Sequence, residues 1–395
     1  MKDLTNLKTF IIDSKNPKEI DDAISLEITE KNANYIWIHV SYPSKLFNYD
    51  SEMDKKARSV SSSSYLIDNY IPMLPKEIIE EANLHQNKIS ETISARIELN
   101  KNGSINNYEI IEAIIKPNYA LSYEDANELI ELQPEQEYEL IVLNKLLKRS
   151  LNYRKENGAI IFDTPFTKLS ITDNKVTIER IEQTYAHNLV SEAMILMGHV
   201  VSDFLIKNKI PAPFRSQKIN CDSNGILDIH KNSTVKYSIL KQYIGKSFIS
   251  IKPNKHETLG LNSYIQSTSP LRRYLDLIVQ RQIQNYLNKE DILDEQTINE
   301  LIDISNIKTK ENNNILKEDR NYYLRKFFVS NNTKTYKIVF IKWINYKKNI
   351  ALVYFLDYYL ETLINLFISI NTYTSKIYNV KFNNNENSNL LEFIH

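Results

Sequence analysis

Cysteine and glycine are scarce in this chain of 395 residues, which contains one cysteine and six glycines. The lone Cys221 cannot form an internal disulfide, and no Cys/His grouping has zinc spacing, so we expect no disulfide partner and no structural zinc. The widely spaced glycines exclude the dinucleotide-binding fingerprint and the P-loop. The HExxH and GxSxG patterns are also absent, which excludes zincin and serine-hydrolase chemistry.

Net charge and long apolar runs are lacking as well. Lys plus Arg and Asp plus Glu both total 49, so a polyanion would need a local basic surface. The first ten residues are too short and polar for a signal peptide, and no apolar stretch approaches the roughly 20 residues of a membrane span. We therefore expect no membrane association. The 42% hydrophobic content is ample for two or more globular domains.

Strand patterns dominate the first part of the chain. Residues 9–12, 24–29 and 35–40 are β-branched or alternating runs bounded by turn residues, which predicts three strands. Residues 94–115 predict a strand pair around Asn102-Gly103, because glycine supplies the positive φ of a tight hairpin. This part is therefore predicted to be a mixed sheet.

Helical periodicity follows, and then strand patterns return. Ser122 and Asp125 predict the capped start of a helix at 122–132. We expect a β-like stretch at 159–181, further helices at 187–208, 270–288 and 295–328, a linker at 329–335, and five strands at 336–344, 350–356, 359–366, 376–382 and 389–394. Five short strands suit a small closed barrel of the OB type. The predicted class is α+β, with domains at 1–329 and 330–395.

Four acids crowd the stretch "DSKNPKEIDD": Asp13, Glu19, Asp21 and Asp22. A lone acid at a strand end is usually a solvated loop residue or a helix cap. Crowded carboxylates, however, raise one another's pKa unless a cation neutralises them. Hard oxygen ligands select Mg²⁺ or Mn²⁺, so the spacing indicates metal-assisted phosphodiester chemistry.

A second cluster is "SPLRRYLD". Ser269 before Pro270 predicts a helix N-cap with proline at the first position, which puts Arg272 and Arg273 in the first turn. Cations there are unfavourable because they oppose the helix dipole. An anion held by the arginines and the free N–H groups would explain the arrangement. The alternative is an ion pair with Asp276, and with two arginines both can hold.

These segments resemble, in the right order, the ribonuclease II and R family of RNB-domain 3′→5′ exoribonucleases. The resemblance covers roughly residues 8–328, and the strands after it resemble a degenerate S1-type RNA-binding barrel. It rests on the acidic stretch and on "ARSVSSSSYLIDNYIPMLP" (57–75), "LSYEDANEL" (121–129), "LVSEAMILMGHVVSDFL" (189–205) and "TSPLRRYLDL" (268–277).

The resemblance implies a metal site. Asp13, Asp21 and Asp22 would hold Mg²⁺, for which Mn²⁺ could substitute, and Asp21 would be essential for catalysis. Glu19 stands where the family usually has Asp, and its longer carboxylate could bind the metal through a water.

The resemblance also implies an RNA-binding site. Tyr65 and Phe162 would stack on the terminal bases, although each, taken alone, could equally be a core residue. Arg272 would contact the scissile phosphate with Arg273 beside it, and Glu318 would act near the 3′ end.

The chain departs from the family pattern in several places. Tyr42 stands where the family usually has Asp, and Gln266, Ser267 and Gln280 replace His, Phe and His. The chain also starts almost at the first motif, without the usual paired cold-shock barrels, so we expect weaker RNA binding.

The predicted function is Mg²⁺-dependent hydrolysis of single-stranded RNA from its 3′ end to nucleoside 5′-monophosphates by a two-metal mechanism. One alternative is a weakened or inactive RNB scaffold that only binds RNA. Another is a metal phosphoesterase acting on small molecules. We expect a monomer in the plastid stroma or the bacterial cytoplasm.

Overall fold

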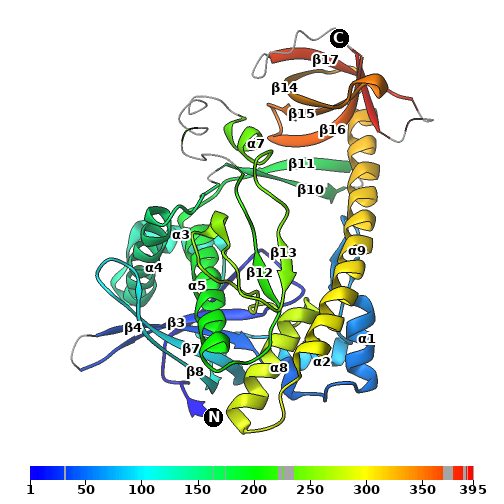
Figure 1. Cartoon of the computed structure of the whole chain (residues 1–395). Helices are drawn as coiled ribbons and strands as arrows, with labels where there is room; N and C mark the ends of the chain where they lie inside the picture. Colours follow the sequence, from blue (N-terminus) through cyan, green and yellow to red (C-terminus); the bar gives the residue numbers. More distant parts are fainter. Residues whose placement is uncertain are drawn as a thin grey trace.

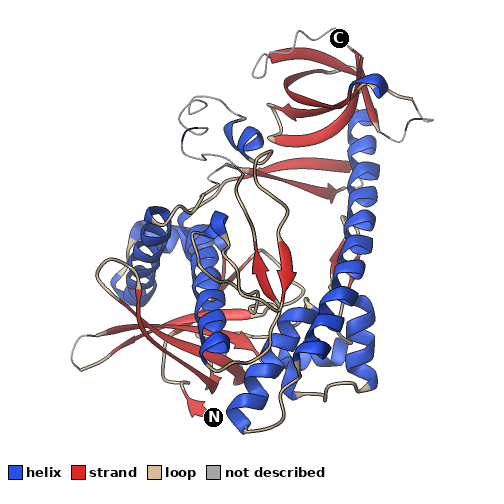
Figure 2. Cartoon of the chain, in the orientation of Figure 1, coloured by secondary structure: helices blue, strands red, loops and turns tan. Residues whose placement is uncertain are grey.

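A computed structural model describes residues 1–30, 33–162, 164–173, 175–220, 225, 235–367, 377–385, 388 and 390–394 (Figure 1). A sheet with helices on one face lies at one end of the molecule, and a β-barrel lies at the other, joined to it by one long helix (Figure 2). The predicted α+β class with a terminal barrel is confirmed. Cys221 lies outside the described residues.

The large sheet has seven strands in the order β1-β8-β7-β4-β3-β2-β9. The outer strands β1 and β9 run parallel to their neighbours and the others are antiparallel, which confirms the mixed sheet. Gly103, with φ +88°, lies in the predicted β7–β8 turn. The strands are β1 (Lys2–Asp3), β2 (Thr9–Asp13), β3 (Asp22–Ile28), β4 (Asn34–Ser41), β7 (Ser90–Leu99), β8 (Ile105–Ile115) and β9 (Tyr119–Ser122).

The register of this sheet brings the acidic stretch together. Antiparallel pairing of Phe10 with Ile24 puts the end of β2 beside the start of β3, so Asp13 and Asp22 become neighbours. Parallel pairing with β9 sets Asp13 opposite Ser122. Ser122 forms the predicted capping box, so the helix after β9 begins at the same edge of the sheet.

Three helices pack on one face of the sheet: α3 (Tyr123–Leu132), α4 (Tyr138–Glu156) and α5 (Tyr185–Lys207). By length and composition α5 could cross a membrane, which corrects the expectation that no apolar stretch approaches that length. Its apolar character has a simpler cause, because Leu189, Ala193, Met197 and Val200 belong to the main core with the sheet.

A second group of helices packs together: α1 (Glu52–Val60), α2 (Lys76–Ala82), α8 (Tyr274–Asn288) and α9 (Glu295–Ser330). They share a core that includes Ala57, Tyr274 and Leu301. The shorter elements are β5 (Ser64–Tyr65), β6 (Tyr70–Ile71), β10 (Phe166–Thr172), β11 (Lys175–Ile181), β12 (Phe214–Ser216), β13 (Phe248–Ser250), α7 (Lys236–Leu240) and the 3₁₀ turns η1 (Pro43–Lys45), η2 (Glu135–Glu137), η3 (Glu257–Leu259) and η4 (Tyr346–Lys348).

The predicted start of the helix after Ser269 is wrong. Helix α8 begins at Tyr274, and Arg273 is its N-cap with extended φ and ψ. The Ser269 N–H donates to Asp276 (3.0 Å), and Arg273 forms a β-bridge with Ser62, so long-range pairing holds the residues before α8 in a turn. Neither arginine lies in the first helical turn.

The C-terminal barrel is closed, in the order β14-β15-β16-β18-β17, as predicted. Phe328 at the end of α9 is fully buried in its core, against rings that include Tyr336, Phe355 and Phe393. The end of α9 therefore belongs to the hydrophobic core of the barrel. The barrel strands are β14 (Thr335–Asn345), β15 (Ile350–Phe355), β16 (Leu360–Phe367), β17 (Ile377–Asn383) and β18 (Leu391–Ile394).

Candidate active site

Asp13 and Asp22 line a cavity of about 450 Å³ between the sheet edge, α5 and the residues before α8. Both carboxylates are partly buried, and neither oxygen of Asp22 has a hydrogen-bond or ion-pair partner among the described residues. Arg272, Arg273 and Tyr123 line the same cavity. A carboxylate without a partner beside two arginines is free to bind a cation or, with that cation, an anionic ligand.

The other two acids are already engaged. Asp21 is buried and accepts hydrogen bonds from the Leu271 N–H (2.9 Å) and Arg272 Nε (3.3 Å). Glu19 is buried and accepts from Ser63 Oγ (2.7 Å) and the Tyr65 hydroxyl. Among the described residues, no three His, Cys, Asp or Glu side chains converge on one metal position. The expected four-acid set is therefore divided, with Asp13 and Asp22 facing the cavity.

The pKa values of these acids are raised, chiefly by burial. Burial raises the pKa of Asp22 from 3.8 to about 7, and the charges of Asp21 and Asp13 add to the rise. Burial also raises the pKa of Asp21 to about 7, against the opposing effect of Arg272. Burial raises the pKa of Asp13 as well. A divalent cation would relieve this cost, because it favours the ionised form of every neighbouring carboxylate.

The two arginines have different partners. Arg273 donates to Asp276 through Nε (3.0 Å) and Nη2 (2.6 Å), which is the ion pair that the sequence allowed. Arg272 faces Asp21 at 3.3 Å, and its side chain is 41% exposed. Arg272 is thus the guanidinium that remains accessible beside the acids, and Arg273 stays anchored at the start of α8.

Tyr65 lies at the acidic cluster and Phe162 does not. The Tyr65 hydroxyl donates to Glu19, the residue is 46% exposed, and its ring centroid lies 5.3 Å from that of Tyr70. Phe162 packs on Tyr237 at 5.2 Å and lines a different cavity, between α7 and the barrel. The two rings have different neighbours, so the structure does not bring the two expected stacking residues together.

Glu318 also lies away from the acids. It is exposed on α9 and lines a cavity with Arg325 and Leu391 near the last barrel strand. The adjacent Asp319 is the acid that contacts the Tyr65 segment, where its Oδ2 accepts from the Ile67 N–H (3.0 Å).

The sequence reasoning missed Tyr123 and His187. Their rings stack at 4.1 Å with an interplanar angle of 8°, and both line the cavity of Asp13 and Asp22. Burial first, and then the charges of Asp13 and Asp22, raise the pKa of the Tyr123 hydroxyl. Tyr123 follows Ser122, so the pairing of β9 with β2 was the signal that could have placed it.

Three of the four departures from the family pattern have hydrogen-bond partners. Tyr42 is a core residue whose hydroxyl donates to Glu112 (2.6 Å). Gln280 donates to the Ser41 carbonyl (2.6 Å). Gln266 accepts from Arg215 Nη1 (2.8 Å), whereas Ser267 Oγ is buried without a partner among the described residues.

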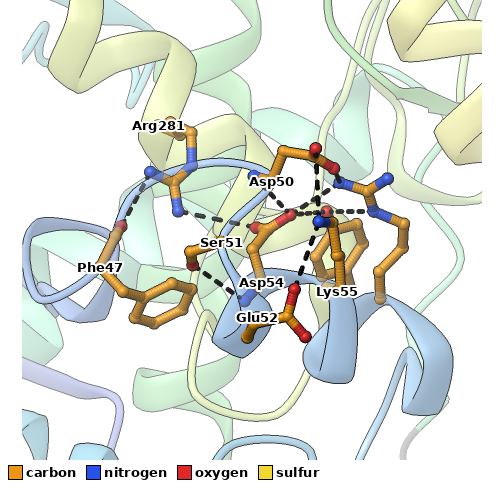
Figure 3. A network of polar contacts seen from close by, with 9 residues as sticks. Phe47, Asp50, Ser51, Glu52, Asp54, Lys55 and Arg281 are labelled. Atoms are coloured by element: carbon orange, nitrogen blue, oxygen red, sulfur yellow. Dashed lines mark hydrogen bonds and ion pairs between the residues drawn. The ribbon is translucent and has the colours of Figure 1, made fainter.

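A buried polar network supports the arginine segment from α1 (Figure 3). Asp54 is fully buried and accepts from the Tyr274 hydroxyl (2.9 Å) and Arg58 Nη2 (2.8 Å), and Arg281 Nη2 lies at 3.7 Å. The Tyr274 N–H also donates to the Ser61 carbonyl. Since Tyr274 directly follows Arg273, these contacts fix the chain on which both arginines stand.

Comparison with known proteins places this geometry in a family. The RNB domain model matches residues 1–289. An uncharacterised ribonuclease of Synechocystis sp. is 31% identical over 355 residues, 89% of this chain and 53% of the relative. The chloroplastic/mitochondrial ribonuclease II of Arabidopsis thaliana is 33% identical over 298 residues, 73% of this chain and 37% of the relative. The chain thus spans about half or less of these curated relatives.

Solved structures have the same fold. A Candida glabrata Dss1 exoribonuclease active-site mutant has a TM-score of 0.89 at 22% identity, over 100% of this chain and 55% of that one. Mycoplasma genitalium RNase R with ribose-methylated single-stranded RNA has a TM-score of 0.84 at 19% identity, over 96% of this chain and 69% of that one. Yeast Ssd1, a pseudonuclease, has a TM-score of 0.70 at 15% identity, over 92% and 50%. Because the family model covers well over half of the sequence, the chain belongs to the RNB domain family.

Proposed function

We propose that this protein is a Mg²⁺-dependent 3′→5′ exoribonuclease that hydrolyses single-stranded RNA to nucleoside 5′-monophosphates. One observation carries the proposal: Asp13, Asp21 and Asp22 crowd together with raised pKa values directly beside the accessible Arg272. Ionised carboxylates held in this way are unfavourable in the protein without a ligand, and a metal ion that also binds a phosphate would stabilise them. The names of the relatives support the same activity.

The residues present fit a magnesium ion. Mg²⁺ is usually held by one or two protein carboxylates, with waters and substrate phosphate as the remaining ligands. Asp22, without a partner of its own, and Asp13 would hold it from the cavity, and Asp21 would join by exchanging its bond to Arg272. When bound, one or two such ions would activate a water and stabilise the leaving 3′ oxygen. Mn²⁺ would substitute.

The side chains of the chain supply the other functions. Arg272 would bind the scissile phosphate, since a guanidinium fork matches phosphate oxygens. Tyr65 would stack on a terminal base, with its hydroxyl oriented by Glu19. We keep Phe162 and Glu318 as RNA contacts farther along the strand, towards the barrel, and not as partners of the acids. Residues 330–395 would form an OB-type RNA-binding domain, and residues 1–329 the catalytic domain.

End-labelled RNA tests the proposal. We expect single-stranded RNA labelled at its 5′ end to shorten stepwise in Mg²⁺, and RNA labelled at its 3′ end to release a labelled nucleoside 5′-monophosphate at once. Chelation with EDTA should stop both reactions. Internal cleavage, or full activity in EDTA, would contradict the proposal. We expect a monomer in a plastid or a bacterial cytoplasm, the compartments that suit the chloroplastic/mitochondrial and bacterial relatives.

The second candidate is an RNA-binding protein without hydrolytic activity. The structural likeness to a pseudonuclease favours it, as does the departure at Tyr42. The same assay separates the two candidates, because such a protein would retain RNA in Mg²⁺ without releasing mononucleotides.

A further inference from the structure

A second cavity, of about 610 Å³, lies on the other side of Arg273 from the acids. Arg273 lines both cavities, so the second begins where the candidate active site ends. Its walls come from the β12–β13 pair, the start of α8 and one face of α9. Its volume lies within the range of roughly 300–1,000 Å³ typical of small-molecule sites.

The charges that line this cavity are mostly positive. Arg215, Lys246 and Arg273 face it together with one carboxylate, Asp276, which is already paired with Arg273. Arg215 is half-buried and donates only to neutral acceptors, Gln266 Oε1 and Ser247 Oγ, at 2.8 Å each. Among the described residues no carboxylate forms an ion pair with Arg215 or Lys246. A half-buried guanidinium without a carboxylate in ion-pair contact points to an anionic ligand.

Apolar and neutral polar groups complete the walls. Phe248 on β13 is 43% exposed and lines the cavity next to Ser247. The α9 face contributes the uncharged Ser305, Asn306 and Thr309. An aromatic ring can stack on a nucleobase, and amide and hydroxyl groups can bond to a base edge or a ribose.

We propose that this cavity binds a nucleoside 5′-monophosphate. The inference rests on the proposed function, which would release such a product on the other side of Arg273. A terminal phosphate monoester has a charge of about −1.5 to −2 near pH 7. Two cations without carboxylate partners suit that charge better than the single charge of a phosphodiester. The released mononucleotide would pass Arg273 and bind in this cavity. Its accumulation there would inhibit the enzyme.

Calorimetric titration of the full chain with AMP, in EDTA so that no hydrolysis occurs, tests the proposal. We expect AMP to bind at least about tenfold more tightly than adenosine or inorganic phosphate, because only AMP engages both the cations and the ring. Phe248→Ala should weaken AMP binding by about 5- to 150-fold. Lys246→Gln should weaken it by at least about fivefold. Lys255→Gln, an exposed lysine outside the cavity, is the matched control and should change nothing.

A 2′-O-methylated RNA oligomer distinguishes the product from the strand. We expect Lys246→Gln and Phe248→Ala to change the affinity for the oligomer less than twofold. Equal losses for AMP and oligomer would assign the cavity to the RNA path and overturn the proposal, as would AMP binding that neither variant weakens, or no AMP binding at all. Because no step requires hydrolysis, failure here leaves the nuclease assay unaffected, and an inactive chain that binds AMP in this cavity would refute only the nuclease.

Discussion

Asp54 and the acidic cluster are two places where carboxylates are buried or partly buried, and they differ in their partners. Asp54 in α1 has partners within the protein: its Oδ2 accepts from Arg58 and the Tyr274 hydroxyl, and its Oδ1, which has no hydrogen bond, lies 3.7 Å from Arg281 Nη2. Asp21 and Asp22 are adjacent in sequence, and Asp22 has no such donor among the described residues. We call the first group complete in charge, because two arginines of the protein neutralise its carboxylate without a ligand. The second group is incomplete, because no cation of the protein forms an ion pair with Asp22 among the described residues, and this difference makes it the candidate site.

A large effect on activity is expected from the accessible arginine. Arg272→Gln should lower kcat by about 10²- to 10³-fold, because it removes a charged donor from the phosphate in the transition state. Arg272→Lys keeps the charge but loses the guanidinium fork, so its kcat should lie between those of wild type and Arg272→Gln. Steady-state kinetics on a short single-stranded RNA measures both. A kcat within threefold of wild type for Arg272→Gln would remove this arginine from the mechanism.

The complete group should matter most for stability. Asp54→Ala should lower the free energy of unfolding by about 3–5 kcal/mol, because it leaves the buried Arg281 without its ion-pair partner and removes the buried partner of Arg58. Asp50→Ala is the matched control: Asp50 also pairs with Arg58, but its side chain is 56% exposed, so we expect less than about 1 kcal/mol. Urea unfolding measures both, and equal losses would contradict the account of Figure 3.

The incomplete group should make the protein less stable as the pH rises. Asp21 and Asp22 have pKa values of about 7 in the folded chain against 3.8 ordinarily, so the folded state binds protons more tightly. Their stabilisation is therefore fully present below about pH 4 and is lost as the pH rises through about 7. In EDTA, Asp22→Asn should lose less stability than wild type between these values. If wild type and Asp22→Asn showed the same dependence of the unfolding free energy on pH between 4.5 and 8, the raised pKa of Asp22 would be disproved.

A smaller effect concerns the length of the last product. Tyr65→Ala should leave hydrolysis working but release a longer terminal fragment, because one stacking face for the last nucleotides is lost. Tyr65→Phe keeps the ring and loses only the hydroxyl bond to Glu19, so its fragment should match wild type. Gel analysis of the end products distinguishes them, and an unchanged ladder for Tyr65→Ala would make Tyr65 a structural residue.

The sequence allowed prediction of what is encoded locally. The strands around the acids, the Ser122 capping box and the barrel strands follow from alternation and turn residues within short windows. The start of α8 did not follow, because Asp276 and Ser62 hold Arg273 and Ser269 in a turn through contacts that no local pattern reveals.

Long-range packing also explains the other differences. Tyr123 and His187 meet only because α3 and α5 start at the same end of the sheet. Phe162 and Glu318 were assigned by resemblance to positions whose neighbours depend on the placement of α7, α9 and the barrel. The core of that barrel includes Phe328, which lies before the proposed domain boundary and is hidden from a reading by strands alone.

The most direct test of the central claim is Asp21→Asn, with hydrolysis and RNA binding measured side by side in Mg²⁺. The substitution removes a charge from the proposed metal site, keeps an amide oxygen that can still accept from Arg272, and leaves Tyr65 unchanged. We predict that hydrolysis falls about a thousandfold or more, whereas the affinity for single-stranded RNA stays within a few-fold of wild type. Hydrolysis that persists, or binding that is lost in parallel with it, would contradict the account.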